Sequence, residues 1–233
     1  MDFLDYKNKH ENEECFILGN SPGLSKENLS LIKNKKIFIC NKGYKAIDLG
    51  LPHFNYYVIS DYTVFNKIKN DIKKYVDVPV FISSVLSKKF AKRLKKDYSH
   101  YVENATIYPK HKGRIIKSIP DELSQGWVGG FTVLIDAILI AVHMGFKNIH
   151  ILGMSLDYTQ ENNHFYNDDS REMAHKNTVP QHLDALLENI LKLKNELNSR
   201  GISIINHSND WKHYKILPYV PLAEYQNTDN TLR

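Results

Sequence analysis

The sequence predicts a single α/β domain whose mostly parallel, Rossmann-like sheet carries helices on both faces. Short apolar runs that end in small or polar residues alternate with stretches of helical spacing, which is the pattern of parallel strands joined by crossovers. The 233 residues are 42% hydrophobic and 11% aromatic and show no internal repeat, so a fibrous or broadly disordered protein is excluded. A chain of this length can bury a sizeable core without disulfides.

The first half of the chain holds four predicted strands. Each is a short apolar run: CFILGN at 15–20, KIFICN at 36–41, YYVISD at 56–61 and VPVFIS at 78–83. A helix is predicted to begin near Ser25, because Ser25 and Asn28 can cap the leucine-rich stretch after the first strand. TVFNKIKNDIKKY predicts a further helix between the third and fourth strands.

The second half holds the strongest helix signal. After Gly129–Gly130, the run FTVLIDAILIAVHM is apolar almost all round, which predicts a helix buried against the sheet that ends near Gly145. The strand NIHILG follows at 148–153. HLDALLENILKLKNELNSR then predicts an amphipathic helix that ends at Gly201, and ISIINHS at 202–208 predicts the last strand.

Three segments lie outside this pattern. Residues 101–126 mix short β-like runs with Pro and Gly and are expected to form an irregular connection. The Rossmann-like domain is expected to cover 15–210, with a polar segment at 1–14 before it and an aromatic, Pro-containing tail at 211–233 after it.

Cysteine usage and the first residues bear on location. Cys15 and Cys40 lie in apolar runs without a Cys or His spacing that would build a zinc site, so both are expected to be core thiols in a reducing compartment. The first fourteen residues lack the order of a signal peptide, and no window approaches the ~18 apolar residues of a spanning helix. We therefore expect a cytoplasmic protein.

Positive charge is concentrated in one region. The formal net charge is only +5, but 87–100 and 109–117 hold a large share of the Lys and Arg residues. Such a block can attract phosphate, nucleic acid or an anionic membrane face, although a solvated helix face is favoured for Lys88 to Lys96. We expect no nucleic-acid partner, and the block fits peripheral contact with the inner membrane as well as an idle surface.

Polar or small residues gather where the predicted strands end. They are Gly19, Asn20, Ser21, Asn41, Ser60, Asp61, Asp157, Asn206 and Ser208. In an open α/β sheet, ligands bind beyond the carboxyl ends of the strands, and an amide can both donate and accept hydrogen bonds. A single Asn at such a place is usually a turn residue, but several at one edge favour a nucleotide site.

Two turns lead into helices at this edge. GNSPGLS lacks the Lys and hydroxyl of a Walker loop and is not a dinucleotide fingerprint, yet it precedes a helix start that favours an anion. Gly129–Gly130 precedes the buried helix in the same way, and close helix–sheet packing explains this pair equally well.

These motifs together resemble a known family. LGNSPGLS, FICNKGY, GWVGGFTVLIDAILIAVHMGFKNIHILGMSLDY and NNHF are similar to the bacterial MptE-like proteins and, beyond them, to the sialyltransferases of glycosyltransferase family 42. The resemblance runs from about Cys15 to Ser208 and implies a Rossmann-like nucleotide-binding core. It leaves two chemistries open: pyrophosphate transfer from ATP to a pterin alcohol, or transfer of a sialic-acid-type sugar from its CMP donor.

The residue after the second strand favours sugar transfer. Pterin diphosphokinases of the archaeal type carry Ala-Asp-Gly there, and the acid resembles a metal ligand, whereas this chain has Asn41. The resemblance implies that Asn20 and Asn41 contact the nucleotide. The full nucleotide set is expected to be Gly19, Asn20, Ser21, Asn41, Asp61, Gly129, Gly130 and Ser155. The sialyltransferases usually have Ser-Gly where this chain has Gly129–Gly130, so a phosphate-facing hydroxyl is missing.

Inverting sugar transfer needs a base for the acceptor hydroxyl and donors for the leaving phosphate. The resemblance places Asp157, Tyr158 and Tyr166 near the phosphate and the acceptor, and it places the base at His175 in AHKNT. His164 and His182 compete for the role of base. CMP is a good leaving group, so no cofactor is expected to be required.

Two features of the acidic residues stand apart. Relatives commonly place an acid two residues after Gly153, where this chain has Ser155, so either Asp157 has taken over that role or the site has lost it. Asp168–Asp169 could supply carboxylates for Mg²⁺ in a kinase-like mechanism, although such a pair in a polar loop is usually solvated.

The sequence thus favours an inverting glycosyltransferase that moves a CMP-activated acidic sugar to a glycan or glycolipid acceptor in surface polysaccharide synthesis. An MptE-like diphosphokinase that uses ATP and Mg²⁺ is the alternative, and a non-catalytic nucleotide-binding protein is a third interpretation. The acceptor, the linkage and the oligomeric state, a homo-oligomer included, are left open.

Overall fold

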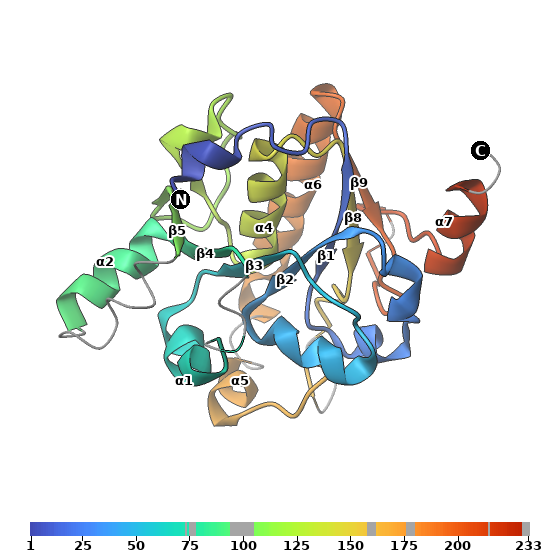
Figure 1. The fold of residues 1–233 in the computed structure, drawn as a ribbon, viewed down its shortest axis with the longest axis horizontal. Coiled ribbons are helices and arrows are strands. Elements are labelled where there is room, and N and C mark those ends of the chain that lie inside the picture. The colour runs from blue at the N-terminus through green and yellow to red at the C-terminus, as the bar shows by residue number, and fades with distance from the viewer. Residues whose placement is uncertain are drawn as a thin grey trace.

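Seven parallel strands form one sheet in the order β5-β4-β3-β2-β1-β8-β9 (Figure 1). The computed structural model describes residues 1–72, 74, 78–93, 105–157, 162–175, 180–213 and 215–229. The strands are β1 Glu14–Leu18, β2 Lys36–Cys40, β3 Tyr56–Ile59, β4 Val80–Ser83, β5 Thr106–Tyr108, β8 Asn148–Leu152 and β9 Ser203–Asn206. The predicted α/β class and all six predicted strands are confirmed.

The segment 101–126 contains more structure than its sequence predicts. Its described part supplies β5 at the edge of the main sheet, and β6 Lys110–His111 pairs in parallel with β7 Trp127–Val128 in a separate two-stranded sheet. These strands have only two or three residues each, so no alternation of apolar and polar residues can develop in them.

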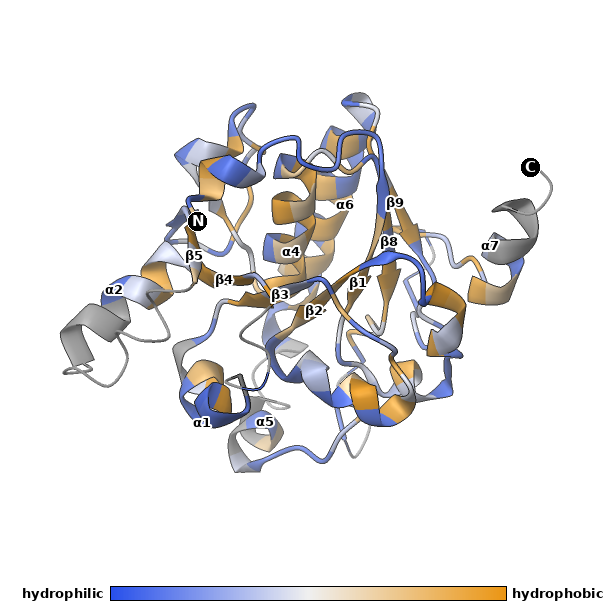
Figure 2. Cartoon of the chain, in the orientation of Figure 1, coloured by the Kyte–Doolittle hydropathy of each residue, from blue (hydrophilic) through white to orange (hydrophobic). Residues whose placement is uncertain are grey.

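Helices cover both faces of the sheet, as predicted (Figure 1). On one face lie α4 Val133–His143 and α6 Leu183–Ser199, and on the other lie α1 Tyr62–Ile72 and a series of 3₁₀ helices. The remaining α-helices are α2 Ser84–Arg93, α5 Ser170–His175 and α7 Leu222–Asp229. Each face has its own apolar core, and α4 is buried on almost all sides, as its composition predicts (Figure 2).

The helix predicted from Ser25 is wrong as a single helix. The chain forms two 3₁₀ helices, η2 Pro22–Lys26 and η3 Leu29–Ile32, with extended backbone at Glu27 between them. Ser25 does not cap a following helix, because its hydroxyl donates back to the Pro22 carbonyl at 2.8 Å. Asn28 does act as a cap, since its side chain accepts from the backbone N–H of Ser30 at 3.2 Å.

Both ends of the described chain contribute to the core. The 3₁₀ helix η1, Phe3–Tyr6, buries Phe3 and Tyr6, and the backbone N–H of His10 donates to the Met144 carbonyl at the end of α4 at 2.7 Å. Beyond β9, Trp211 and Leu217 are buried as well. None of the helices in the described ranges is both long enough and apolar enough to cross a bilayer.

The strand order switches at β1, which pairs with β2 on one side and with β8 on the other. The turns that leave β1 and β8 meet there, and the N–H of Gly19 donates to the Leu152 carbonyl at 2.8 Å. A Cβ added to Gly19 would lie 2.3 Å from the carbonyl oxygen of Gly153, so the close approach depends on glycine. Such a switch point opens a crevice at the carboxyl ends of the strands.

Candidate functional site

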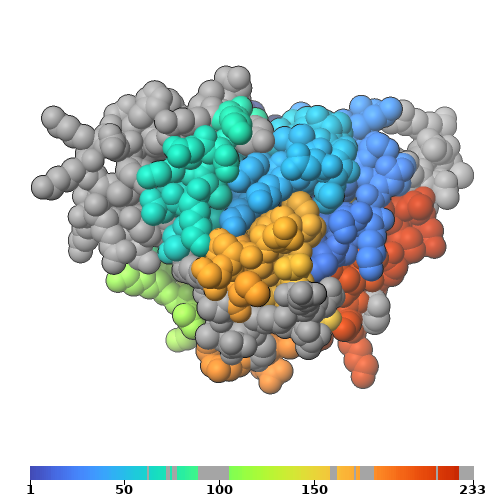
Figure 3. All heavy atoms as spheres, turned by 90° about the horizontal axis from the view of Figure 1, so that it is seen from below, coloured from blue at the N-terminus to red at the C-terminus, as the bar shows by residue number. Residues whose placement is uncertain are grey.

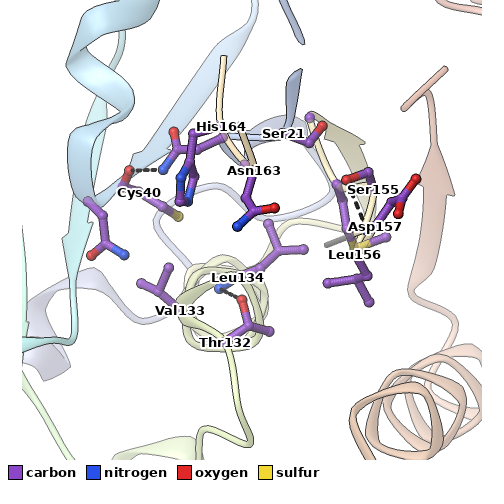
Figure 4. A pocket seen from close by; sticks show the side chains of 15 residues that line it. Ser21, Cys40, Thr132, Val133, Leu134, Ser155, Leu156, Asp157, Asn163 and His164 are labelled. Atoms are coloured by element: carbon purple, nitrogen blue, oxygen red, sulfur yellow. Dashed lines mark hydrogen bonds between the residues drawn. The ribbon is translucent and has the colours of Figure 1, made fainter. Parts of the chain in front are cut away.

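Two adjoining hollows lie in this crevice, with volumes of about 150 Å³ and 380 Å³. The residues that line both are Asn20, Asn41, Thr132, Val133, Asn163 and His164 (Figure 4). The segment 162–175, which includes α5, lies across this side of the molecule beside α1 and the 3₁₀ helix η4, Asn41–Leu49 (Figure 3). We refer to the two hollows together as the cleft.

Three amide side chains bring unpaired oxygens to the cleft. Asn20 follows β1 and donates through Nδ2 to the Cys40 carbonyl at 3.1 Å. The Oδ1 atoms of Asn20, Asn41 and Asn163 are buried and accept no hydrogen bond from any described residue. A buried polar atom without a partner costs about 1–3 kcal/mol, so these three acceptors make the cleft a candidate site for a ligand that can donate hydrogen bonds.

The N-terminus of α4 points into the same cleft. Thr132 is its N-cap, and the Thr132 hydroxyl accepts from the Leu134 N–H at 3.3 Å (Figure 4). The first-turn N–H groups and the positive end of the helix dipole favour an anion at this place. Thr132, Val133 and Leu134 all line the smaller hollow, so the amides and the helix start face one space.

The wall of the larger hollow carries a lysine with a buried partner. Lys110, in β6, lines this hollow, and its Nζ lies 2.5 Å from Oδ2 of Asp136, which is fully buried in α4. Oδ1 of Asp136 accepts from Nε1 of Trp127 at 3.0 Å. Burial raises the pKa of Asp136 above its usual value, although Lys110 and Trp127 act to lower it.

The ion pair between Lys110 and Asp136 explains why residue 129 is a glycine. A Cβ at Gly129 would lie 2.2 Å from Oδ1 of Asp136 and 2.5 Å from Nζ of Lys110, so no side chain fits at this position. Gly129 lines neither hollow, whereas Gly130 lines the larger one with a backbone φ of +59°.

Of the histidines that the structure describes in full, His164 lines the cleft. Its Nδ1 lies 2.5 Å from Oδ1 of Asp168, whose side chain is only 1% exposed. The ring stacks on Tyr166 with centroids 4.9 Å apart and planes 3° apart. Because the carboxylate can only accept, Nδ1 carries a proton, and in the neutral ring Nε2 then has the lone pair, which is the arrangement of an oriented general base.

An ionic cluster fastens α5 over the cleft. Nζ of Lys42 lies 2.8 Å from Glu172 and 3.0 Å from Asp169, and Lys67 lies 2.7 Å from Asp169. Burial by itself lowers the pKa of Lys42, but its hydrogen bonds to Glu172 and Asp169 outweigh burial, so the pKa lies above its ordinary value. The hydroxyl of Tyr166 donates to Glu172 at 3.3 Å. Burial, followed by the charge of Glu172, raises the pKa of Tyr166, so it stays a donor.

His164, Asp168 and Glu172 also offer ligand atoms within 4.8 Å of one another. Mg²⁺ prefers an octahedral set of oxygens. Here one ligand is an imidazole, and the Glu172 carboxylate is already held by Lys42. The backbone N–H of Asn163 and the His164 ring occupy Asp168. The arrangement of these described residues therefore does not fit Mg²⁺.

The turn after β1 already holds an anion of the protein's own. The carboxylate of Asp210 accepts from the hydroxyl of Ser21 at 3.1 Å and from the N–H of Gly23 at 2.8 Å. The anion position predicted at this helix start is thus filled by Asp210. The start of α4 also faces the cleft, and no carboxylate caps it, because its N-cap is Thr132.

The other predicted residues are divided by the structure. Gly19, Ser21, Ser155 and Asp157 line the smaller hollow, while Asp61 and Tyr166 line the larger one. Asp61 caps α1, because its Oδ1 accepts from the N–H of Thr63 at 2.6 Å and of Val64 at 3.1 Å. Asp157 pairs with Lys212 at 2.5 Å and lies across the pocket from His164 (Figure 4).

Two of the predicted catalytic groups fall outside the part of the chain that the structure describes. Tyr158 and the side chain of His175 lie outside the described residues. His182 lines neither hollow and stacks on Phe131, with ring centroids 5.1 Å apart.

A model of the 6-hydroxymethylpterin diphosphokinase MptE-like family matches residues 1–161 of this chain, more than half of its length. The chain belongs to the MptE-like family.

Solved structures share the fold of this MptE-like protein. The sialyltransferase CstII from Campylobacter jejuni, in complex with the substrate analogue cytidine-5'-monophosphate, gives a TM-score of 0.55 at 12% identity over 91% of this chain and 86% of that one. A variant of this sialyltransferase in complex with CMP gives 0.58 at 12% identity over 90% and 86%. The MAf glycosyltransferase from Magnetospirillum magneticum AMB-1 gives 0.55 at 10% identity over 98% of this chain and 40% of that one.

No curated protein sequence matches the chain significantly. At these identities the structural likeness shows the fold alone, and the MptE-like protein has a glycosyltransferase-like fold.

Four residues of this MptE-like protein were absent from the predicted site. Asn163 lies in the NNHF motif, which carried the family resemblance but gave no role to its amides. Lys42 follows the predicted ligand Asn41 directly, and Lys110 stands in a run of cations. Asp210 reaches the first turn from the opposite end of the chain, and no local pattern signals that contact.

Proposed function

We propose that this MptE-like protein is a glycosyltransferase that transfers an acidic, sialic-acid-type sugar from a CMP donor to a hydroxyl of a glycan or glycolipid acceptor. The observation that carries the proposal is that three asparagines with unpaired amide oxygens line the same cleft as the N-terminus of α4. A nucleoside monophosphate matches this arrangement, because its base and ribose supply donors and its phosphate supplies the anion.

Nucleotide binding is assigned to the three amides and the helix start. The oxygens of Asn20, Asn41 and Asn163 accept from the exocyclic amine of the base or from ribose hydroxyls. The phosphate lies at the first turn of α4, next to Thr132. Complexes of structural neighbours with CMP support this choice of base, although at 12% identity they share only the fold.

Sugar transfer requires a proton acceptor, and we assign this role to His164 in place of the earlier expectation, His175. Nε2 of His164 takes the proton of the acceptor hydroxyl while the acceptor oxygen bonds to the anomeric carbon. The bond from that carbon to the phosphate oxygen breaks, and CMP leaves with the electron pair. Asp168 stabilises the imidazolium through Nδ1, and one displacement inverts the anomeric centre.

A thermal-shift panel of CMP, CDP, UDP, GDP and ATP, each with and without Mg²⁺, tests the proposed donor. A ligand that binds only the folded state raises the melting temperature by mass action. A shift with CMP that needs no Mg²⁺ is expected. A shift with ATP and Mg²⁺ alone would instead favour a diphosphokinase, and no shift with any nucleotide would favour a protein without catalysis.

We also propose that the acceptor is reached at an anionic membrane face. Lys112, Arg114 and Lys117 line a groove of about 620 Å³, and none has a carboxylate partner among the described residues. Ile115 stands among them with 53% of its surface exposed. Cations around an exposed apolar side chain suit the headgroup region of an anionic bilayer.

Vesicle co-sedimentation tests the membrane contact. Binding is expected to vesicles that contain phosphatidylglycerol and not to pure phosphatidylcholine, and it should weaken with salt. Ile115→Ser should reduce binding, while Ile47→Ser, at another exposed isoleucine, should not. Equal binding to both vesicle types would contradict the assignment.

A further inference from the structure

We infer that Lys110 is the residue that recognises the phosphate of the bound nucleotide, and that Asp136 and Trp127 position it for that task. The inference rests on the proposed function, because it assigns a residue to the same cleft. In the sequence Lys110 is one of several cations in the basic block at 109–117, and its contact with the buried Asp136 distinguishes it from the others.

The location of the ammonium group supports this role. Lys110 lines the larger hollow together with Gly130 and Thr132, the residues that lead into α4. Its Nζ lies 2.5 Å from the position that a Cβ of Gly129 would take, so the charge stands against the backbone at the entry to this helix. A phosphate at the N-terminus of α4 would therefore meet a helix start and a cation together.

The hydrogen-bonding capacity of Lys110 is only partly used. An ammonium group has three N–H donors, and one points to Oδ2 of Asp136. No other acceptor for Nζ occurs within the described ranges of the chain. The side chain is 16% exposed and lines the larger hollow, so a ligand in the cleft can reach the remaining donors.

Burying the charged side chain of Asp136 costs free energy, which calls for a functional reason. Asp136 interrupts the apolar sequence of α4 with a carboxylate that is 0% exposed. Replacing a buried ion pair by apolar residues is often neutral or stabilising, so packing alone does not call for Asp136. Its two oxygens hold Lys110 on one side and Trp127 on the other, which fixes the ammonium at the wall of the cleft.

The test separates the phosphate from the rest of the nucleotide. Dissociation constants for CMP and for cytidine are measured by calorimetry on the wild type and on Lys110→Met. The variant should lose about ten- to a hundredfold in affinity for CMP, the range of a charge-assisted hydrogen bond, and should keep its affinity for cytidine. Lys110→Arg should keep most of the affinity for CMP, and Lys33→Met, at an exposed lysine at the end of η3, should match the wild type.

A second variant serves as the control for an effect on folding. Lys110→Met leaves the buried Asp136 without its cation, so the double variant Lys110→Met/Asp136→Asn removes both charges. It should unfold at a temperature close to that of the wild type and show the same selective loss of CMP.

Two results would overturn the role of Lys110. They are an equal loss of CMP and cytidine in both variants, or unchanged affinity for CMP. A different result would contradict the proposed CMP donor, namely a wild type that binds ATP and not CMP. The same comparison is then made with ATP and adenosine. A selective loss of affinity for ATP in the variant still supports the role of Lys110. A wild type that binds no nucleotide would overturn both proposals.

Discussion

Asn163 shows how one residue can serve binding at the expense of stability. Its side chain is buried, and its Oδ1 accepts no hydrogen bond from the described residues. The free protein therefore carries a desolvated acceptor that a core residue would not have. The local segment is held by other groups, since the backbone N–H of Asn163 donates to Asp168 at 2.9 Å.

Asn163→Ala is expected to leave the melting temperature unchanged or to raise it slightly, while weakening CMP binding about tenfold. The reason is that the variant removes an unpaired oxygen from the free protein and an acceptor from the complex. Thermal unfolding and calorimetry measure the two effects separately. Asn195→Ala, on the exposed face of α6, is the matched control. Unchanged CMP affinity would remove Asn163 from the site.

His164→Ala is expected to lower kcat for transfer by about 10²–10⁴-fold, because the acceptor hydroxyl loses its base. Steady-state rates with a CMP-sialic-acid-type donor measure this, and the affinity for CMP should change little. Asp168→Asn should lower kcat less, since the imidazole remains but its orientation is lost. His53→Ala lies outside the cleft and serves as control. Full transfer activity of His164→Ala would return His175 to consideration.

Some site residues can be predicted from the sequence and others cannot. Asn41 directly follows β2 and Asn20 is the second residue after β1, so the parallel sheet itself brings them to one edge. Asn163 and His164 lie in a polar loop whose path has no period to read. Lys110 resembles the exposed cations beside it, and only its contact with Asp136 sets it apart.

At the scale of elements, α5 depends on contacts with the opposite side of the cleft. Asp169 and Glu172 form a reciprocal cap at its start, with the N–H of each held by the side chain of the other at 2.9 Å and 3.2 Å. Lys42, from η4, joins both carboxylates. A helix of six residues is too short to be stable alone, so this cluster holds it in place.

Lys42→Met is expected to accelerate amide hydrogen exchange in 162–175, because Asp169 and Glu172 are left facing each other without their shared cation. Exchange measured by mass spectrometry should show the change in this segment and not in β1 or β8. The control is Lys45→Met, which removes only a contact 5.0 Å from the Tyr166 ring centre. Equal exchange in both variants would contradict the role of Lys42.

A buried histidine pair, His150 in β8 and His207 directly after β9, packs against α7. Nδ1 of His150 lies 2.8 Å from Nε2 of His207, and Nδ1 of His207 lies 2.6 Å from the Val220 carbonyl. Phe16 stacks on both rings, and the ring of Tyr225 packs against both at a tilted angle. Burial, together with the neighbouring His150, lowers the pKa of His207 to about 4.

Stability is therefore expected to fall as the pH drops from about 6.5 to about 4. In this window the unfolded chain binds a proton at His207 and the folded chain does not, so the contribution is complete above 6.5 and lost by pH 4. The loss is on the order of 2–3 kcal/mol. Urea unfolding at pH 7.5, 6 and 5 measures it, and His207→Gln should show a weaker dependence on pH. An equal dependence in both proteins would rule out His207 as the cause.

At the scale of the whole molecule, the two halves of the sheet meet through Gly19 and Gly153. A Cβ at Gly19 would collide with the Gly153 carbonyl, and a Cβ at Gly153 would lie 2.8 Å from the carbonyl oxygen of Gly19. The turns after β1 and β8 can approach only if both residues lack side chains.

Gly19→Ala is expected to destabilise the fold by roughly 2–4 kcal/mol, because the turns must separate at the centre of the sheet. Gly201→Ala is a useful comparison: its φ is +70° but no atom lies within 4 Å of the added Cβ, so about 1 kcal/mol is expected. Chemical denaturation of both variants measures the difference. A smaller loss for Gly19→Ala than for Gly201→Ala would contradict the importance of this contact.

The overall architecture follows from the sequence because buried parallel strands are continuous apolar runs, as in CFIL and KIFIC. The short strand β5 and the break at Glu27 could not be predicted in this way. Both are set by contacts with distant parts of the chain. β5 pairs with β4, and the turn before Glu27 is held by Asp210.

The central position of β1 has a consequence during synthesis of the chain. Of the seven strands β1 is made first, yet its partner β8, through the pair Glu14 and Asn148, is made more than half the chain later. Until the ribosome has completed β8, the backbone N–H and C=O groups along one edge of β1 have no neighbouring strand in the sheet. Such edges bind chaperones or other nascent chains, and long-range pairing folds slowly. The strand pair that creates the cleft is thus among the last to close as the protein emerges.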